Sequence, residues 1–156
     1  MSLSRHDTVA MIAVGAFVAT LSAANAAAQG RLAGTTGLDC TFTMIATGTW
    51  TDGDAEASLD ASTFSIQFEL IDTDGATAEV VGPYGASSII VRQTGDYLHL
   101  VQMFMVGPLY TTTVIDRETS DGKLMAVHTR HEYTDTSLPG FTSRPEQYYG
   151  ECEVEQ

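Results

Sequence analysis

The sequence predicts an all-β fold in which eight antiparallel strands form a meander that closes into a small barrel. Three observations support this prediction. Apolar and polar residues alternate along most of the chain after residue 37, turn-forming residues recur at short intervals, and the two cysteines lie in the first and last expected strands. A sandwich of two sheets built from the same strands is the alternative, because the number of strands does not separate the two architectures.

The first two expected strands carry the clearest alternation. Residues 38–50 place apolar side chains between threonines, and residues 63–71 place aromatic and aliphatic side chains at every second position. The apolar members are Cys40, Phe42, Met44 and Trp50 in the first segment and Phe64, Ile66, Phe68 and Leu70 in the second. One face of each strand is therefore expected to be buried.

Six further strands are expected between Gly-, Pro- and Asp-containing turns. They cover residues 76–81, 88–93, 97–105, 109–116, 123–133 and 147–154. In 97–105 both faces are apolar, which indicates either a covered outer face or an exposed patch for a partner. Residues 53–61, between the first two strands, are short and acidic and allow one helical turn.

Closure of the meander places the first strand beside the last, so Cys40 and Cys152 can meet across the closing seam. An even cysteine count in a small exported domain is most simply one disulfide. Two free thiols that bind a metal are the competing interpretation, but no C-x-x-C spacing supports a zinc site. The acidic run from Asp52 to Glu56 resembles the start of a calcium loop, yet it has Ala57 where such a loop needs glycine and Thr63 where it needs glutamate. No metal or cofactor is expected.

The N-terminus has the pattern of a secretory signal. Arg5 and His6 precede an apolar run from Val9 to Leu21 and then small residues, and this run of about 13 residues is shorter than the about 20 needed to span a bilayer. We therefore expect a signal peptide over 1–28, a flexible lead-in over 29–37 and a single domain over 38–156. The product is expected in the periplasm or the medium, without a membrane anchor.

The charge restricts the partners. The chain has 7 Lys and Arg against 20 Asp and Glu, a formal net charge of −13. Removal of 1–28 takes away one cation and one anion, so this charge is unchanged. Nucleic acid and anionic membranes are repelled, whereas a cationic partner is attracted.

The segment from residue 126 to residue 133 contains the first group of candidate site residues. On a strand, His128 and Arg130 share one face, and His131 and Tyr133 share the other. A metal site from two histidines three residues apart would need a helix. The remaining interpretations are a structural ion-pair cluster and a binding face for an anionic ligand or a partner.

The C-terminal strand contains the second group of candidates. Tyr148 and Tyr149 are adjacent, so one can enter the core while the other is displayed. An exposed Tyr149 beside Arg144 and Gln147 would suit a protein interface, in which Tyr and Arg are enriched. The alternative is that both tyrosines only pack around the disulfide.

The last third of the chain, with His128-Thr129-Arg130-His131 followed by Pro145 to Cys152, resembles small exported bacterial β-barrel proteins for which no activity can be carried over. In architecture alone the chain resembles lipocalin- or calycin-like barrels, including periplasmic inhibitors of lysozyme and of secreted proteases. We expect a non-enzymatic binding protein of the cell envelope that engages a protein or small ligand with one barrel end or with the face around His128, Arg130 and Tyr149. The acidic charge favours a cationic partner, so an inhibitor of a lysozyme is one form that this protein could take. A small-molecule-binding barrel, or a barrel enzyme of cyclase or isomerase type that uses His128, Arg130 or a tyrosine, is the alternative.

Overall fold

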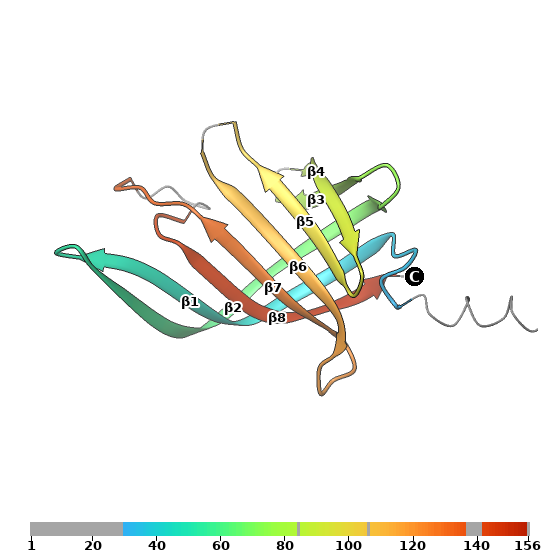
Figure 1. The fold of residues 1–156 in the computed structure, drawn as a ribbon, viewed down its shortest axis with the longest axis horizontal. Helices are drawn as coiled ribbons and strands as arrows, with labels where there is room; N and C mark the ends of the chain where they lie inside the picture. Colours follow the sequence, from blue (N-terminus) through green and yellow to red (C-terminus); the bar gives the residue numbers. More distant parts are fainter. Residues whose placement is uncertain (1–29, 84, 106, 137–141, 156) are drawn as a thin grey trace, which may run out of the picture.

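The computed structural model describes residues 30–83, 85–105, 107–136 and 142–155, and within them the chain forms one closed barrel of eight antiparallel strands (Figure 1). The strands are β1 (Gly37–Thr51), β2 (Asp54–Asp72), β3 (Thr77–Gly82), β4 (Gly85–Thr94), β5 (Tyr97–Met103), β6 (Leu109–Glu118), β7 (Leu124–His131) and β8 (Glu146–Glu155). The expected barrel is thus confirmed. No helix in the described part of the chain is long and apolar enough to cross a membrane. The expected signal peptide lies outside the described residues.

Each strand pairs with its neighbour in sequence, and β1 pairs with β8 to close the ring. In this last pairing Cys40 lies directly opposite Cys152, and the two form the expected disulfide. The bond joins the two strands that are furthest apart in sequence, with a separation of 112 residues. It therefore fixes both the closure of the barrel and the register of the closing seam.

Inward-facing side chains fill one end of the barrel, which we call the closed end. They come from all eight strands and include the disulfide, Leu38, Leu98, Val114 and Leu124. Residues 30–36, expected as a flexible lead-in, instead pack against this end. Leu32 is buried in the core, and Arg31 pairs with Asp116 and Glu118 of β6. The sequence lacks periodicity here because residues 30–36 are held by contacts of single side chains and not by the alternating contacts of a strand.

A break in the register at Thr43 changes which face of β1 is buried. From Phe42 to Met44 the chain advances two residues, while the paired β8 advances only one, from Gly150 to Tyr149. Ile45 consequently packs against the core, whereas Met44 and Trp50 are 40% and 50% exposed. The expectation that these two side chains share the buried face of Phe42 is therefore wrong, because an extra residue at a bulge inverts the alternation.

A second bulge corrects the prediction for Leu70. The register of β2 with β3 breaks between Glu69 and Asp72, and Leu70 adopts a φ of 51°. Leu70 is 67% exposed and Ile71 takes the buried position. The strand thus buries one large aliphatic side chain as expected, but one residue later.

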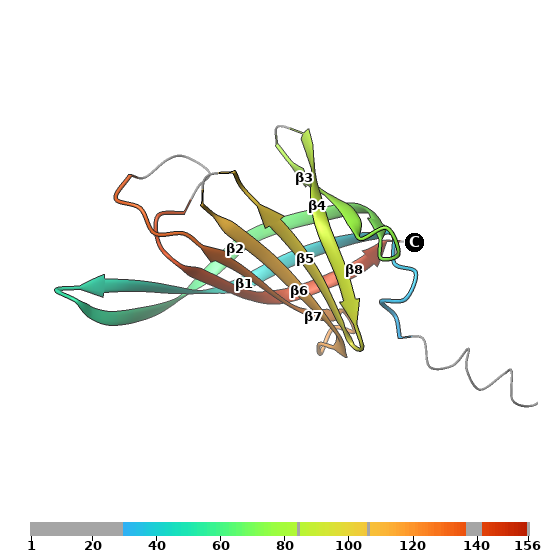
Figure 2. The same ribbon diagram turned by 45° about the horizontal axis from the view of Figure 1, so that its top comes forward.

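The helical turn allowed over 53–61 does not form, because residues 54–61 belong to β2 and Gly53 belongs to the turn before it. Asp52 and Gly53 have φ values of 54° and 93°, so both adopt the left-handed conformation that a two-residue hairpin turn requires. β1 and β2 thereby continue as a hairpin beyond the other strands, and both views show it projecting from the barrel (Figures 1 and 2). We call residues 44–61 the arm.

β5 ends at Met103, two residues before the end of the expected strand 97–105. Leu98 and Leu100 are buried, whereas Met103 is 65% exposed and Met105 is fully exposed. Met103 and Met105 are thus exposed apolar side chains at the end of β5 and just beyond it, whereas the patch for a partner stays a prediction.

The disulfide should contribute strongly to stability, because it closes a loop of more than 100 residues in the unfolded chain. Cys40→Ser combined with Cys152→Ser should lower the free energy of unfolding by about 2 to 5 kcal/mol. Urea denaturation of the oxidised protein and the double variant measures this loss. An unchanged midpoint would show that the antiparallel pairing holds the seam without the bond.

Candidate binding site at the barrel mouth

The opposite end of the barrel, where β2, β4, β6 and β8 begin, is hollowed, and we call it the mouth. A cavity of about 290 Å³ opens there between β2 and the β3–β4 turn and extends toward β7. Its wall is largely apolar and includes Phe64, Ile66, Val80, Val81 and Phe104. The polar members are Ser65, Ser87, Gln102, Tyr110, His128 and Arg130. The cavity forms because β2 and β3 are paired only from Gln67 onward and separate toward the mouth.

Arg130 lines the cavity and is enclosed by aromatic rings. The centre of its guanidinium lies 4.5 Å from the ring centroid of Phe64, 5.3 Å from that of Tyr110 and 5.2 Å from that of Tyr148. These are cation–π distances, and only 16% of the Arg130 side chain is exposed. One ion pair, 3.8 Å long, joins it to Glu146. The cation is thus held in place by its surroundings.

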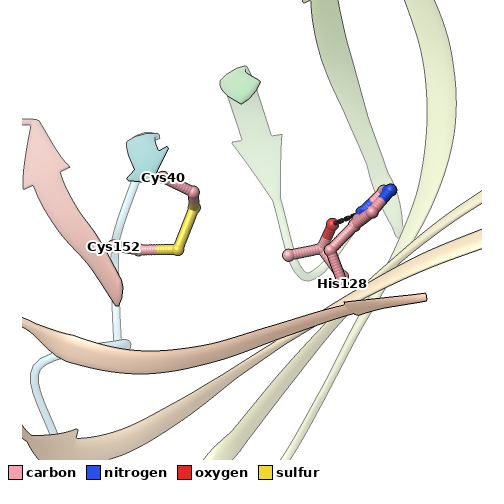
Figure 3. Close-up of a disulfide and its surroundings, with 4 residues drawn as sticks. Cys40, His128 and Cys152 are labelled. Carbon is pink, nitrogen blue, oxygen red and sulfur yellow. Dashed lines mark hydrogen bonds between the residues drawn. A yellow bond between two sulfur atoms is a disulfide. The ribbon is translucent and has the colours of Figure 1, made fainter. Parts of the chain in front are cut away.

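His128 lies beneath Arg130 and is almost completely buried, at 2% exposure. Its Nε2 accepts a hydrogen bond of 3.3 Å from Nε of Arg130. Its Nδ1 lies 2.8 Å from the Thr112 hydroxyl, and Figure 3 marks this second bond with a dashed line. Since Nε2 is the acceptor, the proton of the neutral ring is on Nδ1 and is donated to Thr112. Burial, reinforced by the Arg130 charge, lowers the pKa of His128 from 6.5 to about 3.

Two tyrosine hydroxyls connect the aromatic rings to carboxylates. Tyr110 donates to Glu132 over 3.0 Å, and Tyr148 donates to Glu146 over 2.6 Å. Burial and the bond to Glu132 raise the pKa of Tyr110 to about 12, and burial and the bond to Glu146 raise the pKa of Tyr148. The mouth therefore holds neutral tyrosines, a neutral histidine and one cation near two carboxylates. Among the described residues no group of three or more His, Cys, Asp or Glu could hold a metal ion.

The other candidate residues lie outside the barrel. β7 faces β8 with Thr129 opposite Gln147 and His128 opposite Tyr148, so alternation places His131 and Gln147 on the outer surface. Both line a hollow of about 210 Å³ beside the arm. Tyr149 is 36% exposed and lies opposite Met44. The adjacent tyrosines thus divide between core and surface as expected.

Arg144 is connected to the arm through the ring of Tyr133. Its Nη1 donates to the carbonyl oxygens of Thr134 and Ser143, each at 2.7 Å. Its guanidinium lies 4.7 Å from the Tyr133 ring centroid, and the Tyr133 ring contacts Trp50 at 5.5 Å. The bonded Nη1 indicates a supporting role for this arginine.

The six candidate residues therefore do not form one site: His128 and Arg130 lie inside the mouth, His131, Gln147 and Tyr149 lie on the outer surface, and Arg144 contacts Tyr133. Sequence reasoning missed Phe64, Tyr110, Glu132 and Glu146 as neighbours of Arg130. Phe64 was expected only as core. The signal that unites them is the strand register, in which Tyr110 lies opposite Arg130, and this register cannot be read from one strand alone.

A larger hollow of about 400 Å³ lies at the closed end and includes Arg31 and Lys123. Both cations are already paired there, Arg31 with carboxylates of β6 and Lys123 with Glu151 and Glu153 of β8. The mouth is the stronger candidate for ligand binding, because its wall is mostly apolar, whereas charged residues make up much of the wall of the closed-end hollow.

Protonation of His128 should couple folding to pH. The unfolded histidine binds a proton below its ordinary pKa of 6.5, whereas the folded one stays neutral to about 3, so stability is complete above 6.5 and falls as the pH decreases. Relative to His128→Gln, the wild type should lose about 2 kcal/mol of unfolding free energy between pH 7 and pH 5. Urea denaturation at both values measures it. The exposed His131→Gln is the control and should keep the wild-type slope.

Joint removal of His128 and Arg130 should destabilise the protein. His128→Ala with Arg130→Ala leaves Thr112 without its hydrogen-bond partner, Glu146 without its ion pair and the three rings without the cation. The double change should lower the unfolding free energy by more than about 2 kcal/mol. Thermal and urea denaturation provide the measurement. A double variant that is as stable as the wild type but no longer captures its partner would instead assign the pair to binding, and a stable variant that binds at full strength would rule the site out.

The chain was compared with protein-family models, curated proteins and solved structures, and none of the three comparisons gives a significant match. The chemistry of the mouth and of the surface beside it is consequently the basis for assigning a function.

Proposed function

We propose that the chain is an exported, non-enzymatic binding protein that engages a cationic polypeptide, such as a lysozyme, at the mouth end of the barrel. The mouth cavity would receive an apolar side chain of that partner. The observation that carries the proposal is the cavity itself, which is mostly apolar, opens at one end and has Arg130 fixed in its wall. Anchor side chains that fill such pockets supply much of the affinity in protein interfaces.

The size of the cavity favours an anchor side chain over a free ligand. Sites for small molecules typically enclose about 300 to 1,000 Å³. The mouth, at about 290 Å³, lies at the lower limit of this range. The rest of the interior is filled by the core side chains, so the cavity cannot extend further down the barrel. This observation supports a partner that inserts one group, and it disfavours a carrier of large ligands.

The protonation states at the mouth support binding over catalysis. A general acid or base works best with a pKa near the operating pH. His128 is held neutral with a pKa of about 3, and Tyr110 has a pKa of about 12. Arg130 is permanently charged and already surrounded by rings and Glu146. These groups therefore keep one protonation state at neutral pH, and Arg130 keeps one position, which suits a rigid recognition surface.

The charge of the chain supports a cationic partner. The net charge is −13, and the one cation in the mouth is accompanied by Glu132 and Glu146, which hold the two tyrosine hydroxyls. A negative surface speeds encounter with a positive partner and slows encounter with other acidic proteins. The disulfide and the expected signal peptide support an oxidising compartment, the periplasm or the medium, as the place of encounter.

Filling the cavity tests the proposal. Ser87 lines the mouth but is exposed, so Ser87→Trp should occupy the cavity without removing core contacts. We expect at least a tenfold weaker affinity for lysozyme, measured by calorimetry at low salt, because the anchor can no longer enter. Ser88→Trp is the matched control, since alternation turns this neighbour away from the barrel interior.

Both variants should keep the melting temperature of the wild type. Equal affinities of the two variants would contradict a role for the mouth. Binding of an acidic protein as tightly as lysozyme would contradict the choice of a cationic partner.

A further inference from the structure

The arm has one open edge. β2 pairs with β1 along nearly its whole length but with β3 only between Gln67 and Asp72. Within the part of the chain that the structure describes, residues 54–66 therefore have no backbone partner on their second edge. The edge of β1 differs, because it pairs with β8 as far as Thr47, and Gly48 then donates to the carbonyl of Pro145 over 2.9 Å.

The turn geometry indicates which backbone groups point to the open edge. A two-residue hairpin turn makes its flanking residues, Thr51 and Asp54, a hydrogen-bonded pair, and bonded and non-bonded pairs alternate from there. The N–H and C=O groups that point away from β1 then belong to Ala55 and to every second residue after it. They are the groups of Ala55, Ala57, Leu59 and Ala61.

The two faces of the arm differ in chemistry. Ala55, Ala57, Leu59 and Ala61 lie opposite Trp50, Gly48, Ala46 and Met44, so the outer face is entirely apolar. The inner face, which continues the barrel wall of Phe64 and Ile66, carries Asp54, Glu56 and Asp60 on β2. Every residue from 54 to 61 is exposed. The open edge is thus apolar on one side and acidic on the other.

The charge pattern around the arm argues against a second copy as the occupant of this edge. Between Arg31 and Arg92 the sequence contains nine Asp and Glu and neither Lys, Arg nor His. Two arms paired edge to edge would place the carboxylates of both inner faces side by side, and like charges across strands destabilise pairing. A strand with basic side chains on one face would meet opposite charges there.

We infer that the open edge of the arm is a strand-addition site for an extended segment of a cationic polypeptide in which basic and apolar residues alternate. The inference rests on the proposed function and specifies its partner. The added strand, antiparallel to β2, would bond to the backbone of residues 55–61. Its basic side chains would face Asp54, Glu56 and Asp60, and its apolar side chains would extend the outer face. Continued toward the barrel, the segment reaches the mouth beside Phe64 and Ile66.

A synthetic nine-residue peptide of alternating lysine and valine, acetylated and amidated at its ends, is the probe. Binding is followed by the fluorescence of Trp50, the one tryptophan of the chain, which lies on the arm at 50% exposure. We expect saturable binding that weakens as salt is added. The same peptide with glutamate in place of lysine should bind at least tenfold more weakly.

Backbone changes separate strand addition from simple charge attraction. Cross-strand neighbours share a face, so the valines of the peptide would lie opposite the residues of the apolar outer face, which are Ala55, Ala57, Leu59 and Ala61. Because these four residues carry the open backbone groups, the valines should be the residues that hydrogen-bond to β2. N-methylation of the valines should therefore abolish binding, whereas N-methylation of the lysines, whose N–H groups point away, should preserve it. Equal affinities of the two methylated peptides would overturn the inference.

Substitutions in the protein give an independent test. Ala57→Pro removes one donor from the open edge while leaving the pairing with β1, and should weaken peptide binding at least tenfold; Ala57→Val keeps the donor and should bind like the wild type. The triple variant Asp54→Asn, Glu56→Gln and Asp60→Asn keeps the edge and should lose the salt dependence. If both Ala57→Pro and the triple variant bound the peptide with wild-type affinity, the inference would be overturned. Asp54, Glu56 and Asp60 would then serve only to protect the open edge from pairing with other strands.

Sedimentation and the mouth variant distinguish the remaining cases. A wild-type dimer that Ala57→Pro dissociates would overturn the inference in favour of a second copy.

Ser87→Trp should leave affinity for the short peptide unchanged, because this probe ends on the arm. If Ala57→Pro weakens the binding of peptide and of lysozyme while Ser87→Trp affects neither, the arm is supported and the mouth proposal fails. If only Ser87→Trp weakens lysozyme binding, the arm inference fails and the mouth proposal stands.

Discussion

The pairing of β1 with β8 determines what every other strand can do. Without it the meander would expose two edges along its whole length, and exposed edges invite pairing with other chains. The disulfide between Cys40 and Cys152 fixes the register of this seam at one position. Once the register is fixed, alternation decides which side chains of β8 enter the barrel. Tyr148 enters and Tyr149 does not, so the contents of the mouth depend on a bond near the other end.

The same seam explains how the arm can leave the barrel. At the bulge beside Phe42, Gly150 of β8 lies so close to β1 that a Cβ on it would be 2.0 Å from the Thr41 carbonyl oxygen. Only glycine fits at this approach. Beyond it β1 inverts its buried face, and the hairpin continues with its apolar side outward and its acidic side toward the barrel axis. One local irregularity thus produces a surface that a regular barrel would lack.

The sequence was sufficient to predict the strand count, the closure and the disulfide, because each depends on local patterns or on the cysteine count. It was also sufficient to place His128 and Arg130 on one face. It misplaced Met44, Trp50 and Leu70, since a bulge leaves the apolar pattern intact while it inverts the geometry. Leu32 gave no periodic signal, because it is a single buried side chain that lies outside any strand. The neighbours of Arg130 come from β2, β6 and β8, and only the registers between strands bring them together.

The mouth and the arm lie at the same end of the barrel and have different physical properties. The mouth is rigid, because Arg130 is held by three rings and His128 by two hydrogen bonds, so it offers a shape that is complete before any partner arrives. The arm offers backbone groups, which recognise the extended conformation of a segment without reading its sequence. Charge and alternation then add selectivity along the arm, and the mouth adds selectivity for one side chain. A partner that bound the arm and the mouth at once would lose its translational and rotational freedom only once for two contacts. The proximity of the arm and the mouth therefore makes the binding of such a partner stronger than binding at either site alone.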